Sequence, residues 1–153
     1  MQKPVRNVVG TLVLGIGMAG LAGCGSDPTS STTLSLRIAS AEAKWRDAGL
    51  KNYSFNSLRT CFCVEEFRNV RITVRAGAVA SVVDLRTGVA RPVTFFTPID
   101  SLFGLLRREA LENPSRLSFS VDARFGYPRV IEYGNRELDG GASLAIDSLK
   151  AEP

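Results

Sequence analysis

The chain has three cysteines, and two of them, Cys61 and Cys63, are separated by a single residue. Outside the cytoplasm, two thiols this close usually form a disulfide. Alternate Cα atoms of a regular strand lie roughly 6.5–7 Å apart, at or past the upper limit for a disulfide, so this bridge requires a bend. We therefore expect a structural disulfide at a strand end, which would fix Phe62. A redox-active or metal-binding pair and two reduced, inert thiols are the alternatives.

The chain contains no histidine, and this absence removes much catalytic chemistry. It leaves no imidazole base, no Ser-His or Cys-His nucleophile pair and no His-ligated metal. Two thiolates alone supply only half of a four-ligand metal site. Adjacent Glu65 and Glu66 face opposite ways in a strand, so they do not form an acid/base pair. We predict no catalytic residue, no cofactor and no metal site, and hence a protein that is not an enzyme.

The third cysteine, Cys24, ends a segment with the layout of a secretory signal. Lys3 and Arg6 come first, an apolar run of about 16 residues follows, and small residues lead to residues 21–24 (LAGC). The run is shorter than the ~20 residues that span a bilayer. Residues 21–24 resemble the lipobox read by lipoprotein signal peptidase, which implies a diacylglycerol on Cys24 and cleavage before it. An uncleaved anchor and an ordinary signal with a coincidental cysteine are the alternatives.

The predicted organisation is a signal peptide over 1–23, a lipid-anchored tether over 24–33 and a single domain over 34–150. Residues 25–33 are small and polar, as a flexible tether requires. Acyl chains on Cys24 would hold the protein in a membrane of the cell envelope, with the domain outside the cytoplasm. Gly25 after the lipidated cysteine resembles the outer-membrane sorting pattern, which implies a periplasmic domain in a host with two membranes.

The charge of the mature chain argues against a nucleic-acid partner. The full sequence has 19 basic and 15 acidic residues. Lys3 and Arg6 leave with the signal peptide, which contains no acid, so 17 basic and 15 acidic side chains remain, a net of +2. A chain this close to balance implies no strongly acidic partner.

Two segments have the period of amphipathic helices. The first covers residues 34–50 and has Gly49 as a typical C-terminal signal. The second opens with Thr97 as the expected N-cap and Pro98 at the first helical position, and it ends at 113–114 (Asn-Pro).

Six segments are predicted as strands, three from alternating apolar and polar residues (53–60, 69–75 and 117–122) and three from the turns that precede them. They cover residues 53–60, 69–75, 79–85, 117–122, 129–133 and 143–149. Short turns join them, which predicts an antiparallel sheet. With two helices on one face, the result is an α+β domain of order α-β-β-β-α-β-β-β.

A faint internal repeat is compatible with a duplicated αβββ unit. Residues 53–55 (Tyr-Ser-Phe) recur 64 residues later as 117–119 (Leu-Ser-Phe), and Gly77-Ala78 recurs at the same separation as Gly141-Ala142.

Arg71 and Arg75 lie on the polar side of the strand at 69–75. Further arginines that could extend them into a basic stripe are Arg59, Arg68 and Arg86. A solvated strand face is the ordinary interpretation. The alternative is a site for an anionic ligand such as a lipid headgroup or a lipopolysaccharide phosphate, since arginine binds phosphate well.

Several motifs occur in an order that points to a family. They are Trp45, Tyr53-Ser54-Phe55, Cys61-Phe62-Cys63, the strand and turn at 70–77, Ser101-Leu102-Phe103 and Phe125-Gly126-Tyr127-Pro128. Together they resemble an uncharacterised family of bacterial exported proteins and lipoproteins, catalogued as a domain of unknown function, over roughly residues 40–150. The resemblance implies export and this architecture, and it implies no mechanism.

The predicted function is that of a lipid-anchored envelope module that binds without catalysis. Its expected partners are the membrane, through the lipid on Cys24, and an envelope protein or a lipid or glycan component. The expected contact surface is the open sheet face and the Cys61–Cys63 loop, with Phe62, Arg71, Arg75 and Tyr127 as its candidate residues. One alternative is a small-molecule or lipid carrier, which needs an apolar cavity of ~300 Å³ or more between helices and sheet. The other is a thiol redox protein that uses the cysteine pair.

Overall fold

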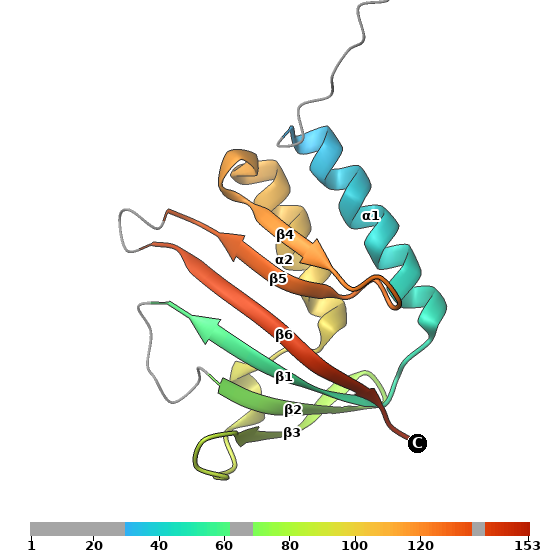
Figure 1. Cartoon of the computed structure of the whole chain (residues 1–153), viewed down its shortest axis with the longest axis vertical. Helices are drawn as coiled ribbons and strands as arrows, with labels where there is room; N and C mark the ends of the chain where they lie inside the picture. The colour runs from blue at the N-terminus through green and yellow to red at the C-terminus, as the bar shows by residue number, and fades with distance from the viewer. Residues whose placement is uncertain (1–29, 62–68, 136–139) are drawn as a thin grey trace, which may run out of the picture.

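A computed structural model describes residues 30–61, 69–135 and 140–153. These residues form a six-stranded antiparallel sheet with two helices on one face, in the order α-β-β-β-α-β-β-β (Figure 1). The fold is the predicted α+β class. The predicted signal peptide, Cys24, Phe62 and Cys63 lie outside the described residues. Within the described ranges, no helix is long and apolar enough to span a bilayer.

Every element expected from the sequence is present. The helices are α1 (Ser31–Ala48) and α2 (Ile99–Glu112). The strands are β1 (Tyr53–Thr60), β2 (Asn69–Arg75), β3 (Ala78–Asp84), β4 (Ser118–Val121), β5 (Pro128–Tyr133) and β6 (Ala142–Ala151). Two short 3₁₀ turns, η2 (Val93–Phe95) and η3 (Pro114–Arg116), flank α2.

The first helix begins earlier than the sequence pattern predicts. Ser30 is its N-cap, and the Ser30 hydroxyl accepts the Thr33 N–H at 3.3 Å. This hydrogen bond satisfies a donor that a helix start would otherwise leave unpaired, so residues 31–33 belong to the helix and not to the tether. At the other end, Gly49 takes the left-handed conformation with φ 64°, as the predicted C-terminal signal requires.

The start of α2 differs from the prediction. The N-cap is Pro98, which makes no side-chain hydrogen bond, so the expected Thr97 cap is wrong. The Ile99 N–H instead donates to the Tyr53 hydroxyl at 3.1 Å, and that hydroxyl donates to the Asp100 carboxylate at 3.3 Å. Burial raises the pKa of Tyr53, which keeps the hydroxyl protonated. A residue of β1 therefore caps α2.

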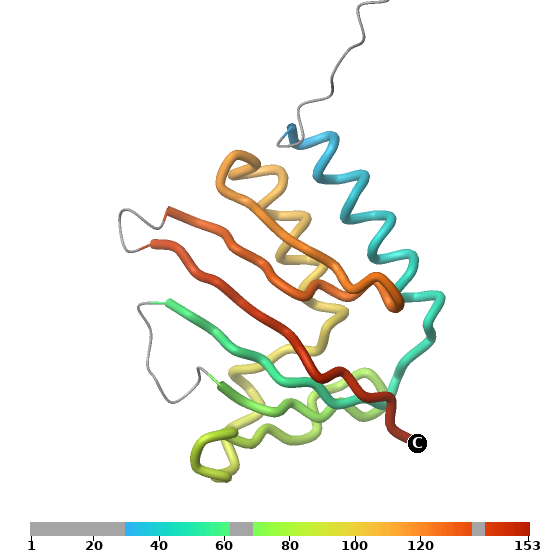
Figure 2. The backbone as a smooth tube through the Cα atoms, viewed as in Figure 1, coloured from blue at the N-terminus to red at the C-terminus, as the bar shows by residue number. Residues whose placement is uncertain are grey.

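The strands lie in the order β3-β2-β1-β6-β5-β4, so each half of the sheet is a meander, and β1 and β6 pair at the centre (Figure 2). The repeated motifs occupy matching places in the two halves. Tyr53 opens β1 and Leu117 directly precedes β4, while Ala78 opens β3 and Ala142 opens β6. The structure thus agrees with two αβββ units placed side by side in the same order.

The core lies between the helices and the sheet, and aromatic side chains connect its parts. Trp45 of α1 meets Tyr53 edge-on, with ring centroids 5.2 Å apart, and Tyr127 at 6.4 Å. On α2, Phe103 and Leu106 are fully buried. The apolar stripes of both helices therefore face the same side of the sheet.

Both outer strands of the sheet are contacted along part of their outer edges. Beside β3, the Arg91 N–H donates to the Val82 carbonyl at 2.9 Å. Beside β4, the Arg37 guanidinium of α1 donates to the Phe119 carbonyl at 3.3 Å and lies over the Phe119 ring. Exposed strand edges invite pairing with another chain, and these contacts oppose it.

Candidate binding site

Arg71 and Arg75 lie on the sheet face that carries no described helix. The neighbouring residues Val70, Ile72 and Val74 are buried toward the helices, so the arginines between and after them point to the opposite face. Of the four residues predicted for the contact surface, these two occupy the expected face.

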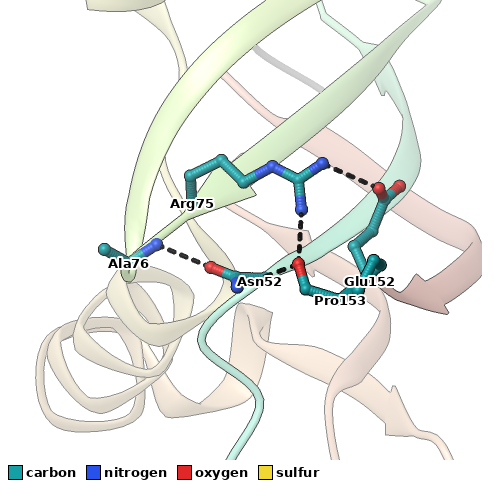
Figure 3. Close-up of polar contacts among 5 residues, drawn as sticks. All are labelled: Asn52, Arg75, Ala76, Glu152 and Pro153. Atoms are coloured by element: carbon teal, nitrogen blue, oxygen red, sulfur yellow. Dashed lines mark hydrogen bonds and ion pairs between the residues drawn. The ribbon is translucent and has the colours of Figure 1, made fainter.

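The guanidinium of Arg75 is engaged within the chain (Figure 3). It donates to the Glu152 carboxylate at 2.9 Å and to the Pro153 oxygen at 3.3 Å. Asn52 completes the contact, because its amide donates to the same Pro153 oxygen at 3.2 Å and accepts the Ala76 N–H at 2.9 Å. Arg75 therefore fastens the segment after β6 to the turn between β2 and β3.

Tyr127 is placed in the core and not on a ligand-facing surface. Its side chain is 6% exposed and packs against Trp45. The preceding Gly126 has φ +78°, and a Cβ there would lie 2.5 Å from the Ala41 carbonyl oxygen of α1. The turn at 125–128 therefore fits tightly against α1, which gives this sequence motif a structural role.

Arg59 does not join a basic stripe with Arg71 and Arg75. It shares the helix side of β1 with Phe55 and Ser57, because alternate residues of a strand face the same way. The predicted stripe is therefore divided between the two faces of the sheet, while Arg68 lies outside the described residues.

On that helix side, a groove of about 180 Å³ lies between the sheet, α2 and the segment that contains η2. Its lining is mostly apolar. The lining residues are Phe55, Ser57, Arg59, Ile72, Phe95, Phe96, Thr97, Leu102, Leu105, Tyr133, Ala142, Ser143 and Leu144.

The groove combines an apolar interior with a few polar groups at one end. Phe55 and Ile72 are buried at its floor, and Phe95 at its rim is 62% exposed. Arg59 stands opposite Leu144 of β6 in the sheet register, near the end of β1. An apolar hollow with a small number of polar groups is the usual composition of a ligand site. This arrangement suits the binding of an apolar group.

A second, wider hollow of about 470 Å³ lies between α1 and β4. The two cationic side chains that line it already form hydrogen bonds within the chain. Arg37 donates to the Phe119 carbonyl in β4, and Lys44 donates to the Ala123 carbonyl just after β4. These side chains hold α1 against the edge of the sheet. The groove beside α2 is therefore the better candidate for a binding site.

Cys61 directly follows Thr60, the last residue of β1, which is the strand-end position that a Cys61–Cys63 bridge requires. Because Cys63 lies outside the described residues, the disulfide itself stays a prediction. Across residues 30–61, 69–135 and 140–153, no three His, Cys, Asp or Glu side chains come together as metal ligands.

A family match spans most of these elements, from residue 37 in α1 to residue 149 in β6. The matching family is described as a family of unknown function, DUF6174. The chain belongs to this family. No curated protein and no solved structure matches it. The DUF6174 region includes all thirteen residues that line the groove.

This groove in the DUF6174 domain was not predicted from the sequence. The sequence contains two signals for it. One is the Phe95-Phe96 pair in a connecting segment, and the other is Arg59, which lies on the same face of β1 as its apolar residues. Neither indicates a hollow until α2 is placed over the sheet.

Proposed function

We propose that this protein is a lipid-anchored lipoprotein of the cell envelope that binds, without catalysis, an apolar group of a partner or ligand in the groove beside α2. The groove carries the proposal, because it joins an apolar interior to an exposed aromatic rim at Phe95. The lipobox resemblance at residues 21–24 supports the anchor. The absence of histidine supports a role without imidazole-based catalysis.

At this site, beside α2, size favours a binding module over a carrier, and the larger hollow beside α1 is a wide, open depression. A pocket that encloses a drug-sized ligand has a volume of at least ~300 Å³, whereas this groove measures about 180 Å³. It has room for a large side chain or for a single slender apolar chain. The proposed site also moves the predicted contact surface from the open sheet face to the helix side of the sheet.

Site-specific photo-crosslinking in the native envelope tests the proposed site. A benzophenone amino acid at Phe95 lies at the groove rim, and the same probe at Ser81 of β3 lies on the open face as a matched control. We expect a discrete adduct from Phe95 and none from Ser81. An adduct from the probe at Ser81 alone would place the contact surface on the open sheet face and refute binding in the groove.

A variant that fills the groove provides a second measurement. Ser57 is 8% exposed on the groove floor, so Ser57→Leu places extra volume there. We expect this change to abolish the Phe95 adduct, while Ser120→Leu, an equivalent change at an exposed position of β4, preserves it. An undiminished adduct in a folded Ser57→Leu variant would contradict binding in the groove.

A further inference from the structure

The only charged side chain that lines the groove, within the described residues, is Arg59. Several other arginines have acidic partners, such as Arg75 with Glu152, Arg91 with Asp84 and Arg107 with Glu42. Among residues 30–61, 69–135 and 140–153, no carboxylate lies within ion-pair distance of the Arg59 guanidinium. Counting only the part of the chain that the structure describes, the groove therefore has an apolar interior and a positive charge with no carboxylate beside it.

The position of this charge distinguishes a polar end of the groove from an apolar end. Arg59 lies one residue before the end of β1, and Phe55 lies four residues back along the same face of the strand. At about 3.3 Å per strand residue, the two positions are roughly 13 Å apart. Leu102 and Leu105 of α2 line the path between sheet and helix. An extended apolar chain fits this path with its polar end at Arg59.

From these observations we propose that the groove binds an anionic amphiphile, an apolar chain that ends in a carboxylate, with the chain along Phe55 and Leu102 and the carboxylate on Arg59. A guanidinium binds a carboxylate through two parallel hydrogen bonds, which a hydroxyl or an ammonium group cannot form. A medium-chain fatty acid has this chemistry. This inference rests on the proposed function, since it names the ligand class of the same groove.

Photoaffinity labelling of the lipidated mature protein in phosphatidylcholine vesicles tests the ligand class. The probe is a decanoate with a diazirine on its chain, and peptide mass spectrometry locates the adduct. We expect labelling of the peptides that carry Phe95 and Leu105. Unlabelled decanoate should compete about tenfold or more better than decanol, because the alcohol lacks the charge-assisted hydrogen bonds, and decylamine should not compete.

Paired arginine variants test the role of the charge. Arg59→Gln should weaken labelling by about tenfold or more, whereas Arg71→Gln, which removes the same charge from the other face of the sheet, should leave it unchanged. Both side chains lie outside the buried core, and the thermal midpoint of each variant verifies its fold. Equal labelling of the two variants would overturn the assignment of Arg59.

The outcomes distinguish this inference from the proposed function. If decanol competes as well as decanoate, the groove binds apolar chains and the carboxylate preference is refuted. If no labelling reaches the groove peptides while Phe95 still forms a protein adduct in the envelope, the ligand is an apolar group of a protein and the amphiphile is refuted. If both are absent, the groove is not a binding site.

Discussion

At the scale of single residues, Tyr53 connects three parts of the molecule. It is fully buried in β1, meets Trp45 of α1 edge-on, and accepts the first N–H of α2 from Ile99. Its hydroxyl also donates to Asp100 in the first turn of that helix. One side chain of the sheet therefore contacts both helices, through a ring contact with α1 and hydrogen bonds at the start of α2.

Replacing Tyr53 by Phe should lower the free energy of unfolding by about 1–3 kcal/mol, because the buried Ile99 N–H loses its acceptor. Urea denaturation measures this change. Tyr133→Phe, at a partly exposed position in β5, is the matched control and should change stability by less than about 0.5 kcal/mol. Equal effects of the two substitutions would show that the hydroxyl of Tyr53 does not cap α2.

Alkaline pH offers a second measurement on Tyr53. Burial raises its pKa in the folded state above the ordinary value of 10.0. The unfolded chain thus loses this proton first, so stability is complete below about pH 10 and falls as the pH rises further. We expect the wild type to lose more stability than Tyr53→Phe between pH 10 and pH 11, as measured by urea midpoints. Parallel curves would contradict the buried, protonated hydroxyl.

For Glu152 we predict the opposite pH dependence of stability, with a loss at acidic pH. A hydrogen bond from Ser54, assisted by the nearby Arg75, holds its pKa below the ordinary value of 4.5. The stability it contributes is present above that value and is lost as the pH falls through the lower pKa of the folded state. Glu152→Gln should therefore flatten the acid limb of a plot of thermal midpoint against pH. Glu112→Gln, an exposed change of equal charge at the end of α2, should keep that limb steep.

At the scale of elements, replacement by alanine should have opposite effects on stability at two glycines. Gly126 lies in the turn that crosses α1, where an added Cβ would collide with the Ala41 carbonyl oxygen at 2.5 Å. Gly104 lies inside α2, and its nearest neighbour, a guanidinium nitrogen of Arg107, is 4.0 Å away. Close packing therefore constrains the first position and leaves the second open.

Gly126→Ala should destabilise the protein by about 2 kcal/mol or more, through the clash and the positive φ. Gly104→Ala should stabilise it by about 0.5–1 kcal/mol, because alanine loses less backbone freedom in a helix. Differential scanning calorimetry measures both changes. A stable Gly126→Ala variant would mean that the turn can move away from α1 without cost.

The elements were more predictable than their contacts. Alternation and flanking turns predicted both ends of β1 and β2, because these signals are local. The cap of α2 was mispredicted at Thr97, since its true partner, Tyr53, comes from a distant strand. Tyr127 follows a turn glycine, and its burial depends on where α1 crosses the turn. The groove likewise exists only after α2 packs on the sheet.

At the scale of the whole molecule, the proposed anchor predicts the chemical form of the N-terminus. Protein isolated from membranes of its own host should begin at Cys24 and carry a diacylglycerol, with further acylation of the new amine. Intact mass spectrometry measures this, and a Cys61–Cys63 bridge would make the mass lighter by two hydrogens. A Cys24→Ser variant should keep its first 23 residues. An unmodified Cys24 in the wild type would refute the anchor.

The pairing of β1 with β6 at the centre of the sheet also governs how the chain acquires its fold. Residues Tyr53 and Ala151, which lie opposite each other in the register, belong to the first and last strands to be synthesised. The strand β6 can pair with β1 only after the other five described strands have been synthesised, and contacts between such distant segments form slowly. Until β6 is in place, the strands form two separate groups, β1–β3 and β4–β5, and the pairing of β6 with β1 joins them into one sheet.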